Sequence, residues 1–251
     1  MAERSADTAL DAQSRAIHSV PEMTDIVTDP ATFSGGTRAD ATNFSREPSP
    51  SLQKPRLGFL GVGWIGRNRM EAMWRSGLAE IVGIADAVEA NTVEAAKVAP
   101  GAERMCSLEE LLALELDGVV IATPSALHAD QAIAALERGL AVFCQKPLAR
   151  TNAETVRVID AARANDRLLA VDLSYRFTSG VQAMRRVVQS GELGKIFAAD
   201  LVFHNAYGPD KEWFYDYKLA GGGCVMDLGI HLVDLGLWVL DGGQGGPKTC
   251  D

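Results

Sequence analysis

Short apolar runs alternate with helix-like stretches from residue 55 onward. Runs that are apolar at nearly every position are typical of parallel strands buried on both faces. They occupy residues 56–60, 80–85, 117–122, 140–144 and 168–173. The stretches between them predict helices over residues 68–77, 89–98, 107–114, 125–138 and 151–165. This alternation predicts an α/β fold, with a doubly wound parallel sheet and helices on both of its faces.

Hydroxyl residues mark where several of these helices are expected to begin. Ser107 with Glu110, and Thr151 with Glu154, have the spacing of a capping box, in which side chains and backbone N–H groups bond reciprocally. Ser125 is expected to cap the helix that follows it.

The pattern changes after residue 175. Residues 177–194 predict a helix, and residues 195–204 alternate between apolar and polar positions as a half-buried strand does. The core-facing positions of that helix are expected to be Val181, Met184, Val187 and Val188. We therefore expect an α+β part after the parallel sheet.

Residues 225–240 predict a helix that is apolar on nearly every side and hence buried. Asp227, His231 and Asp234 share one of its faces, at spacings i, i+4 and i+7. Buried ionisable groups need partners or a cavity. Three interpretations are open: a metal site with few ligands, a structural triad, or acid–base chemistry in which Asp227 holds the tautomer of His231.

A glycine motif stands between the first predicted strand and the first helix. Gly61, Gly63 and Gly66 form G-x-G-x-x-G, with Trp64 and Ile65 between the last two glycines. Gly61 permits a tight turn, Gly63 lets a diphosphate approach the backbone, and Gly66 allows the helix to pack close to the strand. The N–H groups at the helix start would face the phosphates. The motif therefore predicts a Rossmann-type dinucleotide site.

Asp86 ends the second predicted strand, 20 residues after Gly66. That is the expected place of the carboxylate that bonds the adenosine ribose hydroxyls. A carboxylate there repels a 2′-phosphate, and residues 87–94 contain no Arg or Lys to receive one, so NAD is favoured over NADP. The alternative is a turn that binds no phosphate, with Asp86 as a helix cap.

The segment after the third apolar run contains Thr123, Pro124, Ser125 and His128. Ligands of such sheets bind beyond the carboxyl ends of the strands, so these residues could bond a cofactor phosphate or ribose. The alternative is that Ser125 only caps a helix and His128 lies on its solvent side.

Gln145, Lys146 and Pro147 directly follow the fourth run. Pro147 keeps Lys146 out of the helical region, which holds the ammonium group at the strand end, beside the expected cofactor. We therefore predict a functional rather than a merely solvated lysine, with Gln145 beside the cofactor as well.

Composition and charge narrow the class of protein. The chain has 251 residues and a net charge of −9 without a basic stripe, so nucleic acid and anionic membranes are not expected partners. No uninterrupted apolar run approaches the roughly 18 residues of a membrane-spanning helix, and no secretory signal is recognisable at the N-terminus. The cysteines form no C-x-x-C pair, which predicts buried free thiols and a cytoplasmic location rather than a zinc site. They are Cys106, Cys144, Cys224 and Cys250.

Residues 1–54 differ from the rest, because they are rich in Ala, Ser, Thr, Asp and Pro and show no sustained period. This composition predicts a disordered acidic arm. An arm that becomes ordered on a neighbouring subunit is the alternative.

The motifs after residue 55 together resemble the glucose–fructose oxidoreductase / inositol dehydrogenase / MocA family. In chain order they are Gly61-x-Gly63-x-x-Gly66, Thr123-Pro124-Ser125-x-x-His128, Lys146-Pro147-Leu148 and Gly221-Gly222-Gly223-x-x-x-Asp227-x-Gly229-x-His231-x-x-Asp234. The resemblance implies an NAD(P)-dependent oxidoreductase that acts on sugars, sugar derivatives or cyclitols. By position, Lys146 matches the family's catalytic lysine, Asp227 its carboxylate and His231 its general base.

The resemblance also implies a domain plan: an NAD(P)-binding Rossmann domain over residues 55–175 and a substrate domain over 176–251. Two departures matter. The family usually has Glu-Lys-Pro where this chain has Gln145-Lys146-Pro147. Family members also continue past the Asp234 helix into further strands, so the α+β substrate domain is expected to be incomplete. The homo-oligomer of the family is then in doubt for this chain.

Two other functions remain open at this point. A homologue that binds NAD without chemistry, as a sensing module, needs none of Lys146, Asp227 and His231, so their presence favours the enzyme. A scaffold protein has little support beyond the acidic arm.

Overall fold

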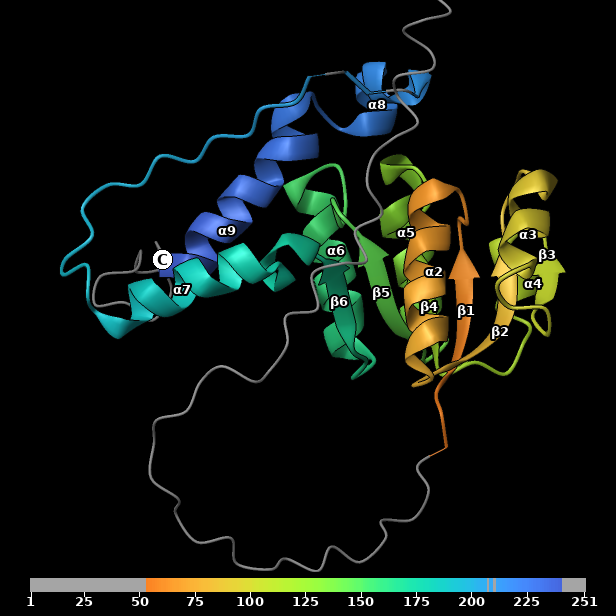
Figure 1. Cartoon of the computed structure of the whole chain (residues 1–251). Coiled ribbons are helices and arrows are strands. Elements are labelled where there is room, and N and C mark those ends of the chain that lie inside the picture. The colour runs from red at the N-terminus through yellow and green to blue at the C-terminus, as the bar shows by residue number, and fades with distance from the viewer. Residues whose placement is uncertain (1–52, 207, 210, 241–251) are drawn as a thin grey trace, which may run out of the picture. The chain divides into compact units, whose positions relative to one another are not determined.

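The computed structural model describes residues 53–206, 208–209 and 211–240. Within them, strands form one parallel sheet in the order β3-β2-β1-β4-β5-β6, which confirms the predicted doubly wound arrangement (Figure 1). The strands are β1 (Arg56–Leu60), β2 (Glu80–Ala85), β3 (Glu103–Met105), β4 (Gly118–Ile121), β5 (Ala141–Gln145) and β6 (Leu169–Asp172). In this order, ligands bind beyond the carboxyl ends of the strands, where the order reverses between β1 and β4.

β3 is a strand that the apolar pattern did not predict. Its residues Glu103, Arg104 and Met105 are exposed or half-buried at the edge of the sheet. An edge strand makes only one set of ladder contacts, so it needs no apolar run.

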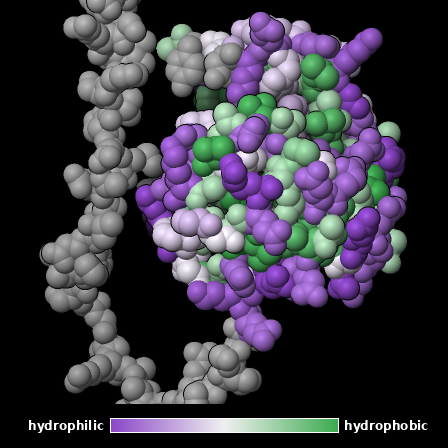
Figure 2. All heavy atoms as spheres, turned by 90° about the vertical axis from the view of Figure 1, so that its right-hand side faces the viewer, coloured by the Kyte–Doolittle hydropathy of each residue, from purple (hydrophilic) through white to green (hydrophobic). Residues whose placement is uncertain are grey.

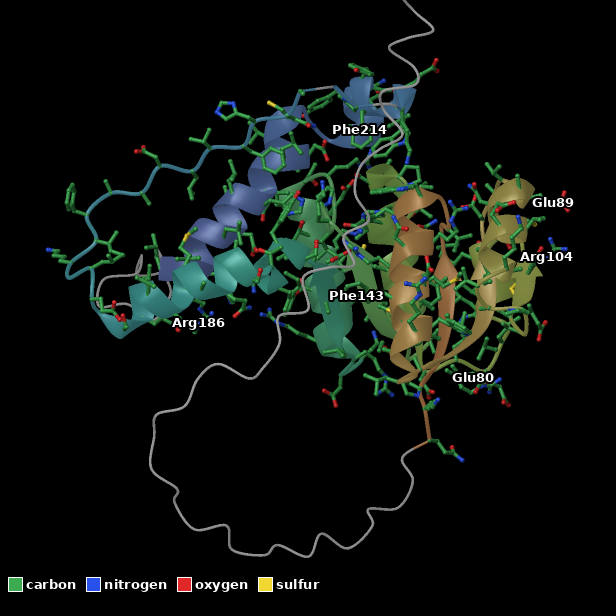
Figure 3. The ribbon with its side chains drawn as sticks, in the orientation of Figure 1. Glu80, Glu89, Arg104, Phe143, Arg186 and Phe214 are labelled. Atoms are coloured by element: carbon green, nitrogen blue, oxygen red, sulfur yellow. The ribbon has the colours of Figure 1, made fainter. Side chains whose placement is uncertain are left out.

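Helices cover both faces of the sheet. They are α2 (Trp64–Ser76), α3 (Glu89–Ala96), α4 (Leu108–Leu111), α5 (Ser125–Glu137) and α6 (Asn152–Ala164). Side chains of β4 alternate between two hydrophobic clusters, as the period of a strand requires. Val119 and Ile121 pack in the cluster of α4, α5 and α6, whereas Val120 packs in the cluster of α2 and α3. Phe143 lies on β5 within the sheet, whereas Glu89 lies at the outer start of α3 (Figure 3).

The hydroxyl half of each predicted capping box is confirmed, whereas the Glu110 and Glu154 carboxylates accept from the N–H of the residue before the cap, Cys106 and Arg150. The Ser107 hydroxyl accepts a bond from the Glu110 N–H at 3.2 Å, and the Thr151 hydroxyl accepts one from the Glu154 N–H at 3.1 Å. The cap predicted at Ser125 is wrong, because Ser125 is the first residue of α5 and the preceding position is a proline without a capping hydroxyl.

After β6 the described chain is helical or irregular. Its elements are η2 (Ser174–Phe177), α7 (Ser179–Ser190), η3 (Glu212–Tyr215), α8 (Tyr217–Ala220), the π-helical η4 (Val225–Gly229) and α9 (Ile230–Leu240). The predicted strand over residues 195–204 is wrong, since this segment has no regular secondary structure. A strand is stabilised by cross-strand pairs, and no described strand lies against it.

The burial predicted for the later helices is also wrong. Val233 and Leu237 of α9 are 58% and 53% exposed, and Met184 of α7 is 56% exposed. α7 and α9 lie side by side (Figure 1). Arg185 of α7 lies over the Trp238 ring of α9, 4.1 Å from the ring centroid. Leu201 lies against Gly236 of α9, and Tyr175 of η2 packs on His231, so the apolar side chains that stay exposed are those on the outer sides of the two helices.

By length and composition alone, the 24 residues Tyr217–Leu240 could cross a membrane, since an 18-residue window within them has a mean hydropathy of 1.6. The sequence pattern did not show this, because Asp227, His231 and Asp234 interrupt the apolar run. Only 11% of its most apolar window is buried among the described residues.

The prediction of buried free thiols is confirmed for Cys144 only. Burial raises the pKa of the Cys144 thiol to about 12. Cys106 and Cys224 are free but exposed, because each lies in a connecting segment rather than on a buried strand. Cys250 and the acidic arm up to residue 52 lie outside the described residues.

Figure 2 shows a side of the protein on which hydrophilic and hydrophobic residues intermingle, the side that faces right in Figure 1 and includes α3 and β3. Most of the large exposed apolar side chains of the described chain lie after β6, although some, such as Leu78 and Leu168, lie before it.

Candidate active site

The glycine turn has the geometry that a dinucleotide site requires. Gly61 has φ +81°, and a Cβ there would lie 2.7 Å from the backbone of Ala122. A Cβ on Gly66 would lie 1.9 Å from the Gly61 carbonyl oxygen, so only glycine lets α2 start so close to β1. A Cβ on Gly63, in contrast, would meet no atom within 4 Å. The open face at Gly63 fits a diphosphate that approaches the backbone at the start of α2.

Trp64 and Ile65 form the first turn of α2, where backbone N–H groups have no partner within the helix. Trp64 is 68% exposed at this position. Both residues thus lie where the sequence predicted cofactor contacts.

Asp86 lies beside the same turn. Its carboxylate accepts the Val62 N–H at 2.8 Å and the Val88 N–H at 2.9 Å. Asn91 donates to it from its side-chain amide at 3.1 Å. The residue therefore fastens the turn to the end of β2 and bonds the backbone before α3, as a cap would. Its place at the strand end remains the one expected of a ribose ligand.

His128 is buried rather than on the solvent side of α5, which corrects that alternative. Nδ1 lies 2.7 Å from the Pro147 carbonyl oxygen, and Nε2 lies 2.7 Å from the Thr123 carbonyl oxygen. Burial lowers the pKa of His128, although the two carbonyl contacts oppose this. Because both ring nitrogens are in contact with backbone, His128 joins the ends of β4 and β5, and its effect on a cofactor would be indirect.

The other residues of this segment line the same end of the sheet. The Thr123 hydroxyl donates to the Gln131 side-chain oxygen at 2.5 Å. Pro124 precedes α5, and Ser125 is buried in its first turn.

Lys146 and Asp227 form the central ion pair of the candidate site. Lys146 Nζ lies 2.7 Å from Asp227 Oδ1 and 2.6 Å from the Asp227 carbonyl oxygen, although the residues are 81 positions apart. The two side chains are 16% and 30% exposed. The fold thus brings the end of β5 and the π-helical turn η4 together.

His231 lies close to this pair and is 7% exposed. Its ring packs edge-on against Tyr175, with the centroids 4.5 Å apart. Burial, and then the positive charge of Lys146, lower the pKa of His231, against a weaker opposite effect of the surrounding carboxylates. Nδ1 is buried and has no hydrogen-bond partner among the described residues. The expected bond from Asp227 to His231 is therefore absent there, because the Asp227 carboxylate pairs with Lys146.

Asp234, the third member of the polar stripe, pairs with Arg176 through three short contacts. This pair is structural in geometry, because it joins η2 to α9. The described residues contain no group of three or more His, Cys, Asp or Glu side chains placed to hold a metal ion.

Three residues around the site escaped the sequence reasoning. Asp172 is buried at the end of β6 and pairs with Arg69 of α2, and Tyr175 packs on His231. A signal existed for Asp172, because it is a carboxylate at the carboxyl end of a buried strand. Arg69 and Tyr175 carry no comparable signal, since their partners are far away in the sequence.

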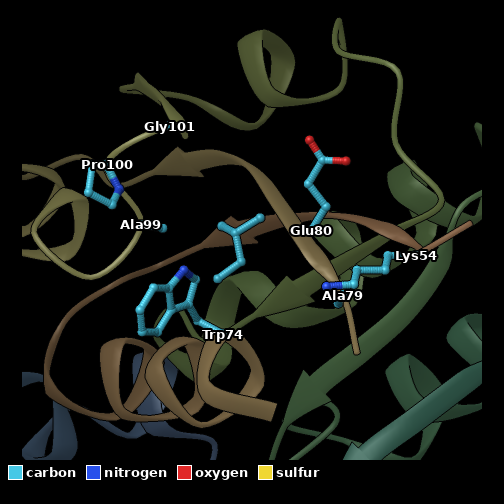
Figure 4. Close-up of a pocket in the computed structure, with 8 residues that line it drawn as sticks. Lys54, Trp74, Ala79, Glu80, Ala99, Pro100 and Gly101 are labelled. Atoms are coloured by element: carbon cyan, nitrogen blue, oxygen red, sulfur yellow. The ribbon is translucent and has the colours of Figure 1, made fainter. Parts of the chain in front are cut away.

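A separate pocket of about 370 Å³ lies at the amino end of β2 (Figure 4). Trp74 of α2 and the segment Ala99–Gly101 line it, with Glu80 at its edge. It contains none of the predicted site residues and lies at the opposite end of the strands.

Comparison with known proteins agrees with this geometry. Residues 55–173 match the family described as "Oxidoreductase family, NAD-binding Rossmann fold", and residues 181–244 match the "GFO/IDH/MocA C-terminal domain". Inositol 2-dehydrogenase 3 of Saccharopolyspora erythraea is 30% identical over 190 residues, which cover 74% of this chain and 54% of that protein.

Solved structures give the same result. An NAD-binding protein from Listeria innocua is 29% identical with a TM-score of 0.69, over 75% of this chain and 56% of that one. Levoglucosan dehydrogenase in complex with NADH and levoglucosan is 27% identical with a TM-score of 0.63, over 74% and 54%. The chain thus spans about half the length of the relatives that it matches. It belongs to the GFO/IDH/MocA oxidoreductase family, and residues 55–173 carry the NAD-binding Rossmann fold of that family.

Proposed function

We propose that this chain provides the cofactor site and the catalytic residues of an NAD-dependent dehydrogenase that acts on a sugar, sugar derivative or cyclitol. The observation that carries the proposal is the Lys146–Asp227 pair beside the buried His231, at the end of the sheet that holds the glycine turn. The names of relatives, such as inositol 2-dehydrogenase, D-glucoside 3-dehydrogenase and 1,5-anhydro-D-fructose reductase, support this substrate class.

Each residue has a role that follows from its surroundings. His231 is held neutral by its lowered pKa, so its ring can accept the proton of a substrate hydroxyl as a general base. The Lys146 ammonium group can bond the same oxygen and stabilise the negative charge that develops there. Asp227 orients that ammonium group by accepting from it at 2.7 Å. NAD, when bound, supplies the acceptor for the hydride from the substrate carbon.

The glycine turn, Trp64, Ile65 and the Thr123–Ser125 segment would hold the cofactor, with Gln145 at the adjacent strand end. Asp86 favours NAD over NADP, because its carboxylate repels a 2′-phosphate. We extend the proposal to a division at residue 175, with the substrate domain over 176–251. The adjoining family matches, which end at 173 and begin at 181, support this division. A cytoplasmic location stays a prediction, and the homo-oligomer of the family stays in doubt for this chain.

Titration of the full chain with NADH and NADPH, followed by nicotinamide fluorescence, tests the cofactor site. Tighter binding of NADPH would contradict the role of Asp86. A panel of sugars and cyclitols, read by nicotinamide absorbance, then tests turnover.

Lys146→Ala and His231→Ala are expected to abolish turnover in this panel. Lys97→Ala and His204→Ala are matched controls, since both positions are exposed outside the site. Turnover unchanged in the first two variants would refute the roles. NADH binding without turnover on any substrate would favour the dinucleotide-sensing module instead.

A further inference from the structure

Asp172 is the one carboxylate that is buried among the described residues, with 5% exposure. It ends β6, and its register partner on the neighbouring strand is Gln145, the last residue of β5. Lys146 follows Gln145 directly. The buried charge therefore lies one strand away from the lysine of the candidate site.

A continuous set of polar contacts joins Asp172 to Lys146. Arg69 forms an ion pair with Asp172 and donates to the Ser174 hydroxyl at 3.2 Å. The Gln145 amide nitrogen donates to Asp172 Oδ2 at 2.9 Å, and the Gln145 side-chain oxygen accepts the Lys146 N–H at 3.0 Å. Both ends of the amide are thus occupied, which fixes its orientation.

The contacts also explain why this chain has glutamine at position 145. A glutamate there could accept the Lys146 N–H but could not donate to Asp172 without a proton. Two carboxylates would then face each other at hydrogen-bond distance with one guanidinium group to share, which is unfavourable. The Glu-Lys-Pro pattern places its carboxylate at position 145, whereas this chain carries its carboxylate on the next strand.

We propose that Asp172 is a positioning residue, which acts through Gln145 to hold the Lys146 strand end against Asp227 and replaces the carboxylate of the Glu-Lys-Pro pattern. The importance of this positioning of Lys146 for catalysis rests on the proposed function. The position of Lys146 itself can be measured on the chain without cofactor or substrate.

Acetylation of Lys146, measured by peptide mass spectrometry relative to Lys97, reports how well Lys146 is held. Lys146 is 16% exposed and paired, so acetylation is expected to be slow. Gln145→Glu removes the amide that donates to Asp172, and Asp172→Asn keeps an acceptor oxygen but removes the negative charge that Gln145 and Arg69 bond. Loss of a hydrogen bond to a charged group corresponds to roughly a tenfold change in an equilibrium constant, so each is expected to speed acetylation by about that factor.

The double variant Gln145→Glu/Asp172→Asn returns the carboxylate to position 145. Its asparagine can donate to the new glutamate and accept from Arg69, so acetylation is expected to return to within about twofold of the unchanged chain. Asp130→Asn, which removes an exposed carboxylate that pairs with Arg157, is the matched control and should change nothing. A merely structural role of Asp172 predicts no such rescue.

Acetylation that is unchanged in both single variants, or a double variant as fast as the faster single variant, would overturn the proposal. If a single variant fails to fold, Gln145→Met replaces it, because it removes the amide without adding charge. Unchanged acetylation in that variant would overturn the proposal too. NADH titration of the unchanged chain separates the two claims, since failure to bind refutes the proposed function while the acetylation cycle still decides the role of Asp172.

Discussion

Gly63 and Gly66 lie three residues apart in the same turn, yet a methyl group would meet opposite surroundings at the two positions. At Gly66 it would overlap the backbone of Gly61, and at Gly63 it would project into open space. One glycine therefore serves the packing of the fold, whereas the other leaves room for a ligand.

Gly66→Ala is expected to destabilise the fold by roughly 2–4 kcal/mol, because the backbone overlap cannot be relieved by a rotamer change. Gly63→Ala is expected to change the free energy of unfolding by less than about 1 kcal/mol, since its φ of −61° suits alanine. It should still weaken NADH binding by roughly tenfold or more, because the methyl group keeps the diphosphate from the backbone. Urea unfolding and NADH titration of both variants provide the measurement. Equal affinity of Gly63→Ala and the unchanged chain would contradict the cofactor site.

His231 and His128 both have lowered pKa values, His231 through burial and the charge of Lys146, and His128 through burial. The folded state then binds fewer protons than the unfolded state around the ordinary value of 6.5. The stability that these two groups contribute is fully present above that value. It is lost as the pH falls through 6.5 towards their folded-state pKa values.

We therefore expect the free energy of unfolding to fall below pH 6.5, by at most about 1.4 kcal/mol per pH unit for each histidine. Urea titrations across this range measure the slope. His231→Gln should reduce it, because one of the two groups no longer titrates. An identical slope in that variant would show that His231 is not held neutral by its surroundings.

Elements before residue 175 followed their sequence patterns more closely than those after it. The strand runs and the capping hydroxyls of α4 and α6 are local signals, and the structure has these elements within a few residues of their predicted ends. The segment 195–204 has a strand-like alternation, but a strand also requires a neighbour, which an alternating pattern does not supply. The motifs likewise singled out Lys146, Asp227 and His231, which the structure brings close together. They did not reveal that Asp227 pairs with Lys146, because that contact joins elements that are distant in sequence.

The ion pair between Arg176 and Asp234 joins η2 to α9 and is expected to contribute to the free energy of unfolding. The side chain of Asp234 is 9% exposed and that of Arg176 is 34% exposed. Asp234→Ala is expected to cost roughly 1–3 kcal/mol of unfolding free energy, because Arg176 is left partly buried without its partner.

The control for this change is Asp130→Ala, where both partners are largely exposed and a cost below about 1 kcal/mol is expected. Chemical unfolding of both variants measures the difference. Equal costs at the two positions would mean that the Asp234 pair contributes no more than a surface contact.

At the scale of the described chain, the two parts differ in how their apolar side chains are covered. The helices of the parallel sheet bury their apolar faces in two clusters, one on each face. After β6, apolar side chains of α7, α9 and the segment between them stay exposed, with Phe197 at 96%. Tyr217–Leu240 also has the length and hydropathy of a membrane-spanning helix, so a bilayer has to be considered as the environment of this exposed surface.

The polar stripe argues against a bilayer for this helix. A charged side chain near the membrane centre costs roughly 2.5–3.5 kcal/mol, and insertion would also break the pairs that Asp227 and Asp234 form with Lys146 and Arg176. We therefore expect alkaline carbonate to release the chain fully from membranes of the cells that express it. Asp227→Leu/Asp234→Leu removes both charges and is expected to raise the fraction that resists extraction. Resistance of the unchanged chain to carbonate would show instead that the helix enters the membrane, and the ion pairs of Asp227 with Lys146 and of Asp234 with Arg176 could not then persist.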